Sequence, residues 1–458
     1  MSVTVILGGT VVLADRLAAN HDVIISDGRI VAIEPSCERV PLWDAQSSVS
    51  GGERGHRDGS SVLFSDELTA AIGRLQENRT DEPSLCPLLV DARGCYVMPG
   101  FIDIHSDYIE SVASPRPGVV MDLSAALYEA DRALVAQGVT TIFHSLSIYG
   151  LTVFDHKPIR RFENVSRLIE QIGAMREREA DGHLIRHRMH LRVELDAVAR
   201  LIEIHDYLLA GKVDLLSFMD HTPGQGQYRD LEVFVNTLRG YKRDISDEAA
   251  HELIRRQQGA AKLSLEQMRR LIATAHEQGI AVASHDDDSA DKLELMQQLG
   301  VSISEFPISL AVAREAARRK LHTVAGAPNV LLGHSHSGNL SAREAVCAGA
   351  ADILCSDYYP AALLRAVFTL HHDCNIALPD AVALVTLNPA RATGLDAELG
   401  EIAVGKRGDI LVVREHAVTL SPDAAAARKD AAAADESGEA QGAATRSAVR
   451  GVCVVEVA

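Results

Sequence analysis

The chain has 458 residues, 47% of them hydrophobic, and a formal net charge of −18. This length exceeds one ordinary domain, and the apolar content is enough to fill a large core. The negative charge argues against nonspecific nucleic-acid binding, which needs a basic face, and no apolar run approaches the roughly 20 residues of a membrane helix.

The first residues of the chain and its cysteines indicate in which cellular compartment the protein is expected. The first residues lack the basic leader and cleavage site of a secretory signal, so we expect a cytoplasmic protein. The seven cysteines are odd in number, scattered and without a CxxC pair. This pattern disfavours a disulfide framework or a zinc ribbon.

Residues 1–98 are predicted to form an N-terminal β segment. Asp27-Gly28 between two apolar runs is a strong hairpin signal. A polar stretch at about 35–87, rich in Gly and Ser, is interpreted as an insertion. The predicted strands around it are Val3 to Leu7, Thr10 to Leu13, Val23 to Ser26, Arg29 to Ile33, Leu88 to Asp91 and Cys95 to Met98.

Residues 99–394 alternate short apolar runs with longer amphipathic stretches, which is typical of repeated βα units. Eight strands in this order predict a TIM barrel, whose active sites lie at the carboxyl ends of the strands. The predicted strands are Phe101 to His105, Thr140 to Ser145, Met189 to Leu195, Val213 to Met219, Ile280 to His285, Ser302 to Phe306, Val330 to His334 and Ile353 to Asp357. The predicted helices include Asn164 to Arg176, Leu265 to Gln278, Ala290 to Leu299, Leu310 to Leu321 and Ala361 to His371.

Residues 395–458 are predicted to be a C-terminal β segment. An Ala-rich and acidic insertion interrupts it at about 417–447. The apolar tail from Ala448 to Val457 is expected to rejoin the N-terminal strands. The two end segments would then form a small β-sandwich domain beside the barrel.

Side chains that bind divalent metals occur at several of the predicted strand ends. A strand places residues i and i+2 on one face, so His105 and Asp107 are expected to point together into the barrel mouth. Glu194 shares a strand face with His190 and Arg192. The candidate ligands are His105, Asp107, Glu194, His221, His285 and Asp357.

Taken one at a time, each of these residues is better explained by an ordinary structural role. Their joint placement at five strand ends favours a site for two cations bridged by a carboxylate. Imidazole and carboxylate donors together suit zinc, and manganese or iron would also fit.

The sequence resembles the amidohydrolase superfamily over nearly the whole chain outside the two insertions. The features are the entry Met98-Pro99-Gly100-Phe101-Ile102-Asp103-Ile104-His105, Asn388-Pro389-Ala390, and the return from Gly400 to Asp409. Within that superfamily, the internal motifs are similar to those of the ribose triphosphate diphosphatases of the bacterial carbon–phosphorus lyase pathway. These motifs are Ser114 to Val119, Met219 to Gln225, Ala283 to Asp287, Glu305-Phe306-Pro307, Gly326 to Val330, Ser335 to Asn339 and Ser356-Asp357-Tyr358.

The resemblance implies hydrolysis of α-D-ribose 1-methylphosphonate 5-triphosphate to the 5-phosphate and pyrophosphate, in phosphonate catabolism. The substrate would be a small phosphorylated ribose. It also implies that Asp357 accepts the proton of the attacking water, and Glu194 is the expected metal bridge. Asp286 and Asp287 are expected to orient His285 or a metal-bound water.

Four further side chains are candidates for substrate binding. Arg116, in a proline-rich loop, could clamp a phosphate through its guanidinium, although a surface arginine without such a role is the alternative. His334, His336 and Asn339 surround a Gly-containing turn where imidazoles and backbone donors could bind phosphates. Of the two histidines we favour His336, which lies in the family motif.

Two departures from the superfamily pattern affect the metals. Asp107 occupies the position of a second histidine in many members, and no lysine stands out as a carbamylated bridge. These departures leave the number and identity of the metals open. Separately, an amidohydrolase or nucleobase deaminase on the same barrel is the alternative function, with ammonia or a ring-opened acid as its product. A non-catalytic scaffold would be expected to lose ligands, and all six are present. A homo-oligomer is compatible with the sequence, which does not report the oligomeric state.

Overall fold

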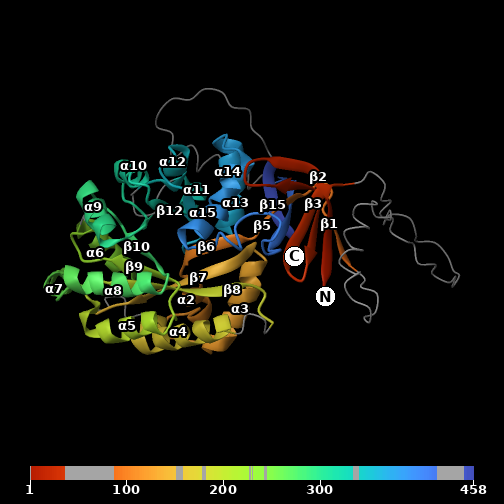
Figure 1. Cartoon of the computed structure of the whole chain (residues 1–458). Coiled ribbons are helices and arrows are strands. Elements are labelled where there is room, and N and C mark those ends of the chain that lie inside the picture. Colours follow the sequence, from red (N-terminus) through yellow and green to blue (C-terminus); the bar gives the residue numbers. More distant parts are fainter. Residues whose placement is uncertain are drawn as a thin grey trace, which may run out of the picture.

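The protein forms a parallel barrel beside a separate mixed sheet (Figure 1). The computed structural model describes residues 2–36, 87–150, 158–177, 182–225, 228, 231–241, 245–333, 340–419 and 448–457. No helix in these parts of the chain is long and apolar enough to cross a membrane.

The barrel is an eight-stranded parallel sheet whose strands follow chain order, as the predicted TIM barrel requires. Its strands are β6 (Phe101–Ser106), β7 (Val139–Ile148), β8 (Arg186–Glu194), β9 (Leu215–Met219), β10 (Ala281–His285), β11 (Ile303–Glu305), β12 (His322–Gly326) and β13 (Ile353–Cys355). A parallel bridge between Ser106 and Asp357 joins the first strand to the chain just after the last one. The sheet therefore closes at the carboxyl ends of its strands.

The prediction of the seventh strand at Val330 to His334 was wrong. The structure has β12 at His322–Gly326, and the later apolar run is helix α11 (Ala327–Leu332). Pro328 suits the first turn of that helix, and Gly333 ends it with a φ of +79°. A short apolar run carries too little periodicity to distinguish a strand from a buried helix, which explains the error.

Helices cover the outside of the barrel (Figure 1). All five predicted helices are present, and the largest difference is that α10 ends at Arg318 instead of Leu321. Five of the described helices begin at a serine whose side-chain oxygen accepts a backbone N–H, which stabilises the first turn: Ser246, Ser264, Ser289, Ser309 and Ser341. The helices are α2 (Tyr108–Ala113), α3 (Leu123–Val135), α4 (Phe162–Glu177), α5 (Leu201–Leu209), α6 (Leu231–Tyr241), α7 (Asp247–Gln258), α8 (Leu265–Glu277), α9 (Ala290–Leu299), α10 (Leu310–Arg318), α11, α12 (Ala342–Cys347), α13 (Ala362–Asp373), α14 (Leu378–Ala383) and α15 (Leu387–Ala392).

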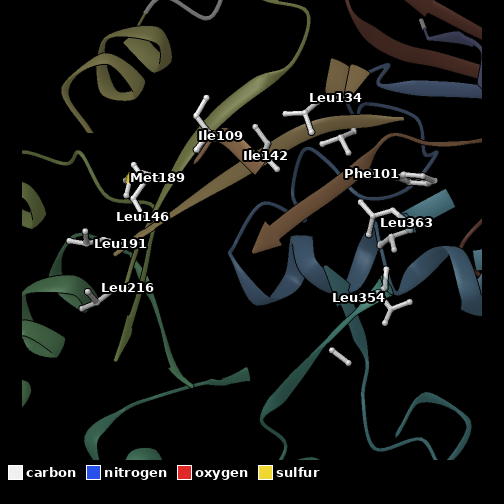
Figure 2. Packing of buried hydrophobic residues seen from close by; sticks show 14 of the residues in the cluster. Phe101, Ile109, Leu134, Ile142, Leu146, Met189, Leu191, Leu216, Leu354 and Leu363 are labelled. Carbon is white, nitrogen blue, oxygen red and sulfur yellow. The ribbon is translucent and has the colours of Figure 1, made fainter. Parts of the chain in front are cut away.

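The barrel strands bury apolar side chains on both faces. The outward face packs on the helices, as Figure 2 shows for Met189 and Leu191 of β8 among the residues of this layer. The inward face has its own cluster, which includes Phe143, Leu215 and Ile303. Full burial of each such side chain contributes about 1.5–3 kcal/mol, so the two layers together supply most of the stability of the barrel.

Both ends of the chain build the second sheet, as expected from the sequence. Its strands are β1 (Val3–Val12), β2 (Leu17–Ser26), β3 (Arg29–Pro35), β4 (Leu88–Asp91), β5 (Tyr96–Pro99), β14 (Ile410–Thr419) and β15 (Ala448–Val457). Their order is β15-β14-β5-β1-β2-β3, with β4 paired to β1. Alternate residues of β1 and β2 enter two different apolar clusters, so both faces of this sheet are buried, as in a sandwich.

The strands of this sheet differ from the sequence prediction in one detail and match it in another. The runs Val3 to Leu7 and Thr10 to Leu13 belong to one strand, β1, whose register shifts near Gly9. The hairpin at Asp27-Gly28 is present, with positive φ at both residues. The segment boundaries at 98 and 394 stay predictions, and most of both insertions lies outside the described residues.

Gly100 provides a test of the packing between β5 and β6. A Cβ at this position would lie 2.2 Å from Oγ1 and 2.8 Å from Cβ of Thr140 on β7. Gly100→Ala is therefore expected to destabilise the barrel by about 1–3 kcal/mol through overpacking. The midpoint of denaturant unfolding should fall. Gly173→Ala in α4 is the control, because its Cβ would meet nothing closer than 3.6 Å. Equal midpoints for the two variants would contradict the overpacking.

Candidate metal centre

Four buried metal-binding side chains meet at the carboxyl ends of the barrel strands. His105, Glu194, His285 and Glu305 are the last or next-to-last residues of β6, β8, β10 and β11. Their exposed fractions are 1%, 5%, 6% and 0%. Parallel strands bring these ends to one rim, and this places side chains far apart in sequence at one site.

The donor atoms form two adjacent groups that could each hold a metal ion. One group is His105, His285 and Glu305, and the other is His221, His285 and Asp286. In each group the ligand atoms lie within 4.8 Å of one another. The groups share His285, so they are neighbours.

Unpaired polar atoms at this place fit a missing cation. Glu305 Oε2, His285 Nδ1 and Asp286 Oδ2 are buried without a hydrogen-bond partner among the described residues. A buried polar group left without a partner costs about 1–3 kcal/mol. Imidazole nitrogens and carboxylate oxygens are donors that a divalent transition metal accepts, so the residues present fit such an ion.

Glu305 was not predicted as a ligand, although its motif was noted. Its Oε1 lies 2.8 Å from His105 Nδ1, and its Oε2 lies 3.8 Å from His190 Nε2. A carboxylate in this position can bind a metal or orient a metal-binding imidazole. The signal was available in the sequence, because Glu305 is the next-to-last residue of the sixth predicted strand, close to its carboxyl end, and His285 is the last residue of the fifth.

His221 lies between two carboxylates. Its Nδ1 pairs with Glu194 Oε1, and its Nε2 lies 3.4 Å from Asp286 Oδ2. Burial alone would lower the pKa of His221, but the charges of Glu194 and Asp286 raise this pKa to about 10. A metal ion would have to displace the proton that the ring otherwise holds.

The two aspartates after His285 face different partners. Asp286 Oδ2 lies 3.2 Å from His285 Nδ1, an ion-pair distance without the alignment of a hydrogen bond, so the role of Asp286 in orienting this imidazole stays a prediction. Asp287 instead accepts hydrogen bonds from the hydroxyls of Ser284 and Ser304, at 2.6 Å and 2.5 Å. Asp287 therefore braces β10 against β11.

Asp357 follows β13 and is held by backbone bonds on both sides. Its N–H donates to the carbonyl of His105 at 3.0 Å, and its carbonyl accepts from the N–H of Asp107 at 2.8 Å. Burial and the charge of Asp107 raise the pKa of Asp357 to about 7, although Arg192 opposes this shift. Its φ of +57° is a strained conformation for a residue with a side chain.

Asp107 does not share a strand with His105, contrary to the sequence expectation. Strand β6 ends at Ser106, and Asp107 is the first flanking residue of α2. Its Oδ2 lies 3.7 Å from Arg160 Nη2, and Arg160 also pairs with Glu110 at 2.8 Å. Asp107 thus borders the two metal groups and belongs to neither of them. Its role as a ligand stays a prediction.

The predicted substrate-binding residues are only partly described. Arg116 is exposed in the loop after α2, where its carbonyl accepts the N–H of Val119 at 3.2 Å. His334, His336 and Asn339 lie outside the described residues. Their predicted role in binding phosphate therefore stays a prediction.

A second histidine cluster is explained by structure alone. Asp131 of α3 accepts the backbone N–H groups of Leu184 and Ile185 at 3.0–3.1 Å and faces His187 Nε2 at 3.1 Å. His187 in turn contacts His144 on the neighbouring strand at 2.9 Å. The carboxylate is already saturated with donors, so the cluster fixes the start of β8 against α3.

Replacing Glu305 tests the metal centre. Glu305→Gln is expected to lower the affinity for zinc about 10- to 100-fold, because the amide is a poorer ligand and a poorer acceptor for His105. Metal content after equilibration in zinc buffers, measured by mass spectrometry, reports the change. Glu266→Gln, an exposed position paired with Arg270, is the control. Undiminished zinc occupancy in Glu305→Gln would remove this residue from the centre.

Comparisons with known proteins agree with this architecture. The amidohydrolase family model matches residues 248–429. The chain is 34% identical over 335 residues to the alpha-D-ribose 1-methylphosphonate 5-triphosphate diphosphatase of Escherichia coli K12, covering 72% of this chain and 86% of that protein. It is 23% identical over 382 residues to an imidazolonepropionase of Porphyromonas gingivalis, covering 78% and 83%. Among solved structures, molinate hydrolase shares the fold, with a TM-score of 0.52 at 13% identity over 90% of this chain and 89% of that chain. The chain belongs to the amidohydrolase family.

Proposed function

We propose that this protein hydrolyses α-D-ribose 1-methylphosphonate 5-triphosphate to the 5-phosphate and pyrophosphate, within phosphonate catabolism. The observation that carries the proposal is the 34% identity to a protein of that name from Escherichia coli, over 86% of its length. The fold alone would not support this choice, since the same barrel hosts many reactions. Buried carboxylates and imidazoles at the barrel mouth are compatible with phosphoryl chemistry.

The metal-binding residues in this proposal are the six from the sequence together with two that the structure adds. Two zinc ions are proposed, with Glu194 as the bridge, and manganese or iron would also fit. The proposed ligands are His105, Asp107, Glu194, His221, His285 and Asp357, joined by Asp286 and Glu305. When bound, such cations supply Lewis acidity and neutralise charge on phosphoryl oxygens.

Asp357 is the proposed proton acceptor from the attacking water. Asp357 is half-buried at the rim where the strand ends meet, with its backbone bonded to His105 and Asp107. Desolvation and the charge of Asp107 raise its pKa to about 7, which suits a group that must take up and release a proton. The backbone bonds on both sides fix the position of its main chain.

A cyclic amide hydrolase or a nucleobase deaminase is the second candidate. Imidazolonepropionases from three bacterial strains match 78–85% of this chain at 22–25% identity. This candidate predicts a ring-opened acid or ammonia as product instead of pyrophosphate. The higher identity to the diphosphatase favours the first proposal.

Product analysis tests the proposed reaction. Zinc-reconstituted protein is expected to release one pyrophosphate per ribose 5-triphosphate, because attack would fall on the phosphoryl group next to the ribose. Phosphorus NMR of the products distinguishes pyrophosphate from single phosphate release. Protein stripped of metal with a chelator is the control and should be inactive. Release of ammonia from a nucleobase, with no pyrophosphate from the triphosphate, would reject the proposal.

Substitution of Asp357 tests the proposed base. Asp357→Asn is expected to lower kcat about 10²- to 10⁴-fold. In saturating zinc its metal content should stay close to that of the wild type, because the other seven proposed ligands remain. Asp103→Asn is the control, since Asp103 is a fully buried aspartate of the neighbouring strand β6 and an amide oxygen can still accept the N–H of Ser356. An unchanged rate in Asp357→Asn would show that another group takes the proton.

A further inference from the structure

Arg192 is a cation inside the barrel whose charge the protein does not balance directly. It is half-buried on β8 and donates through Nε to the sulfur of Met219 at 2.9 Å. Among the residues that the structure describes, no carboxylate forms an ion pair with it. A thioether is a weak acceptor, so most of the donor capacity of the guanidinium is unused.

The other half-buried arginines of the barrel differ in this respect. Arg160 pairs with Glu110, Arg176 with Asp214 and Arg186 with Asp409. These pairs show that this fold normally supplies a carboxylate when it removes an arginine from water. Desolvating a charge without a partner is costly, so an unpaired guanidinium suggests an anionic partner from outside the chain.

The position of Arg192 on β8 directs it into the mouth. His190 on the same strand faces the barrel interior, where its ring contacts the hydroxyls of Ser145 at 3.0 Å and Ser217 at 2.9 Å. Arg192 follows two residues later on the same face, and Glu194 two residues after that. Arg192 is therefore between the interior histidine and the rim carboxylate.

The positive charge of Arg192 affects the pKa of groups on or next to three strands of the site. Burial is the main reason for the low pKa values of His105 and His190, and the charge of Arg192 lowers both further. At Asp357, where burial and Asp107 raise the pKa, the same charge acts in the opposite direction. These shifts agree with the position of Arg192 on the inward face of β8, two residues before the rim carboxylate Glu194.

We infer that Arg192 binds a phosphoryl group of the substrate beside Asp357 and thereby selects polyphosphates over uncharged amides. This inference rests on the proposed function. The planar fork of a guanidinium donates two parallel hydrogen bonds to phosphate oxygens, which a lysine at this position would not do. Unlike the exposed Arg116, Arg192 is half-buried on the inward face of β8, the strand that ends in the candidate ligand Glu194.

Binding of inorganic tripolyphosphate to zinc-loaded protein tests the inference without requiring turnover. Arg192→Gln is expected to weaken binding about 10- to 100-fold, the loss of a charge-assisted contact, and Arg192→Lys to weaken it less. The zinc content of both variants should equal that of the wild type. Arg188→Gln is the matched control: Arg188 is on the same strand near its other end, where Asp214 lies 3.8 Å away. Its affinity for tripolyphosphate should match that of the wild type.

Other results would overturn the inference. Failure of wild-type protein to bind tripolyphosphate, or equal affinity in wild type and Arg192→Gln, removes Arg192 from substrate binding. If Arg192→Gln weakened the binding of succinate as much as that of tripolyphosphate, Arg192 would be a general anion contact. That result would reject selection of phosphoryl groups. If Arg192→Gln does not fold or does not bind zinc, the test uses Arg192→Lys instead. Wild-type affinity for tripolyphosphate in Arg192→Lys would contradict a bidentate contact.

The binding and turnover results separate this inference from the proposed function. Arg192-dependent tripolyphosphate binding without pyrophosphate release from the ribose triphosphate would reject the proposed reaction and retain Arg192 as a phosphoryl site. Normal pyrophosphate release by Arg192→Gln, with unchanged KM, would retain the reaction and reject the role of Arg192.

Discussion

The closure of the barrel at Ser106 and Asp357 is the constraint on which the candidate site depends. This bridge joins the first strand to the end of the eighth, and the backbone bonds of Asp357 to His105 and Asp107 reinforce it. Closure thus brings the proposed base beside His105, the first of the candidate metal ligands. The positive φ of Asp357 costs of order 1–3 kcal/mol, which the surrounding packed strands must offset.

The interior below this closure changes from apolar to polar along the strands. Phe143 and Leu215 belong to the apolar interior, and two residues further along their strands are Ser145 and Ser217, which hold the ring of His190. A period of two keeps these side chains on one face. The apolar layer excludes water beneath the centre, and the polar layer fixes the imidazoles above it. Electrostatic interactions at the rim are stronger for this reason than they would be in water.

Much of this arrangement could be predicted from the sequence, because parallel strands end at one rim whatever their distance along the chain. That rule placed His105, Glu194 and His285 correctly at strand ends. It could not place Asp107, since the end of β6 at Ser106 depends on the start of α2. It also did not show that Glu305 would face His105, because a contact across 200 residues is set by barrel packing. The misplaced seventh strand has a local cause, a short apolar run that suits a helix equally well.

The charge of the centre has a consequence for the order of binding. Glu194, Asp286, Glu305 and Asp357 converge at the mouth, and the imidazolium of His221 and the guanidinium of Arg192 face them. A triphosphate carries several negative charges and would be repelled by such a site, in a chain whose net charge is −18. Divalent cations reverse the local field, because they are the largest charges in any site that holds them. If the protein acts on a triphosphate as proposed, metal loading should therefore precede substrate binding, and the inferred contact of Arg192 would add direction to an attraction that the cations supply.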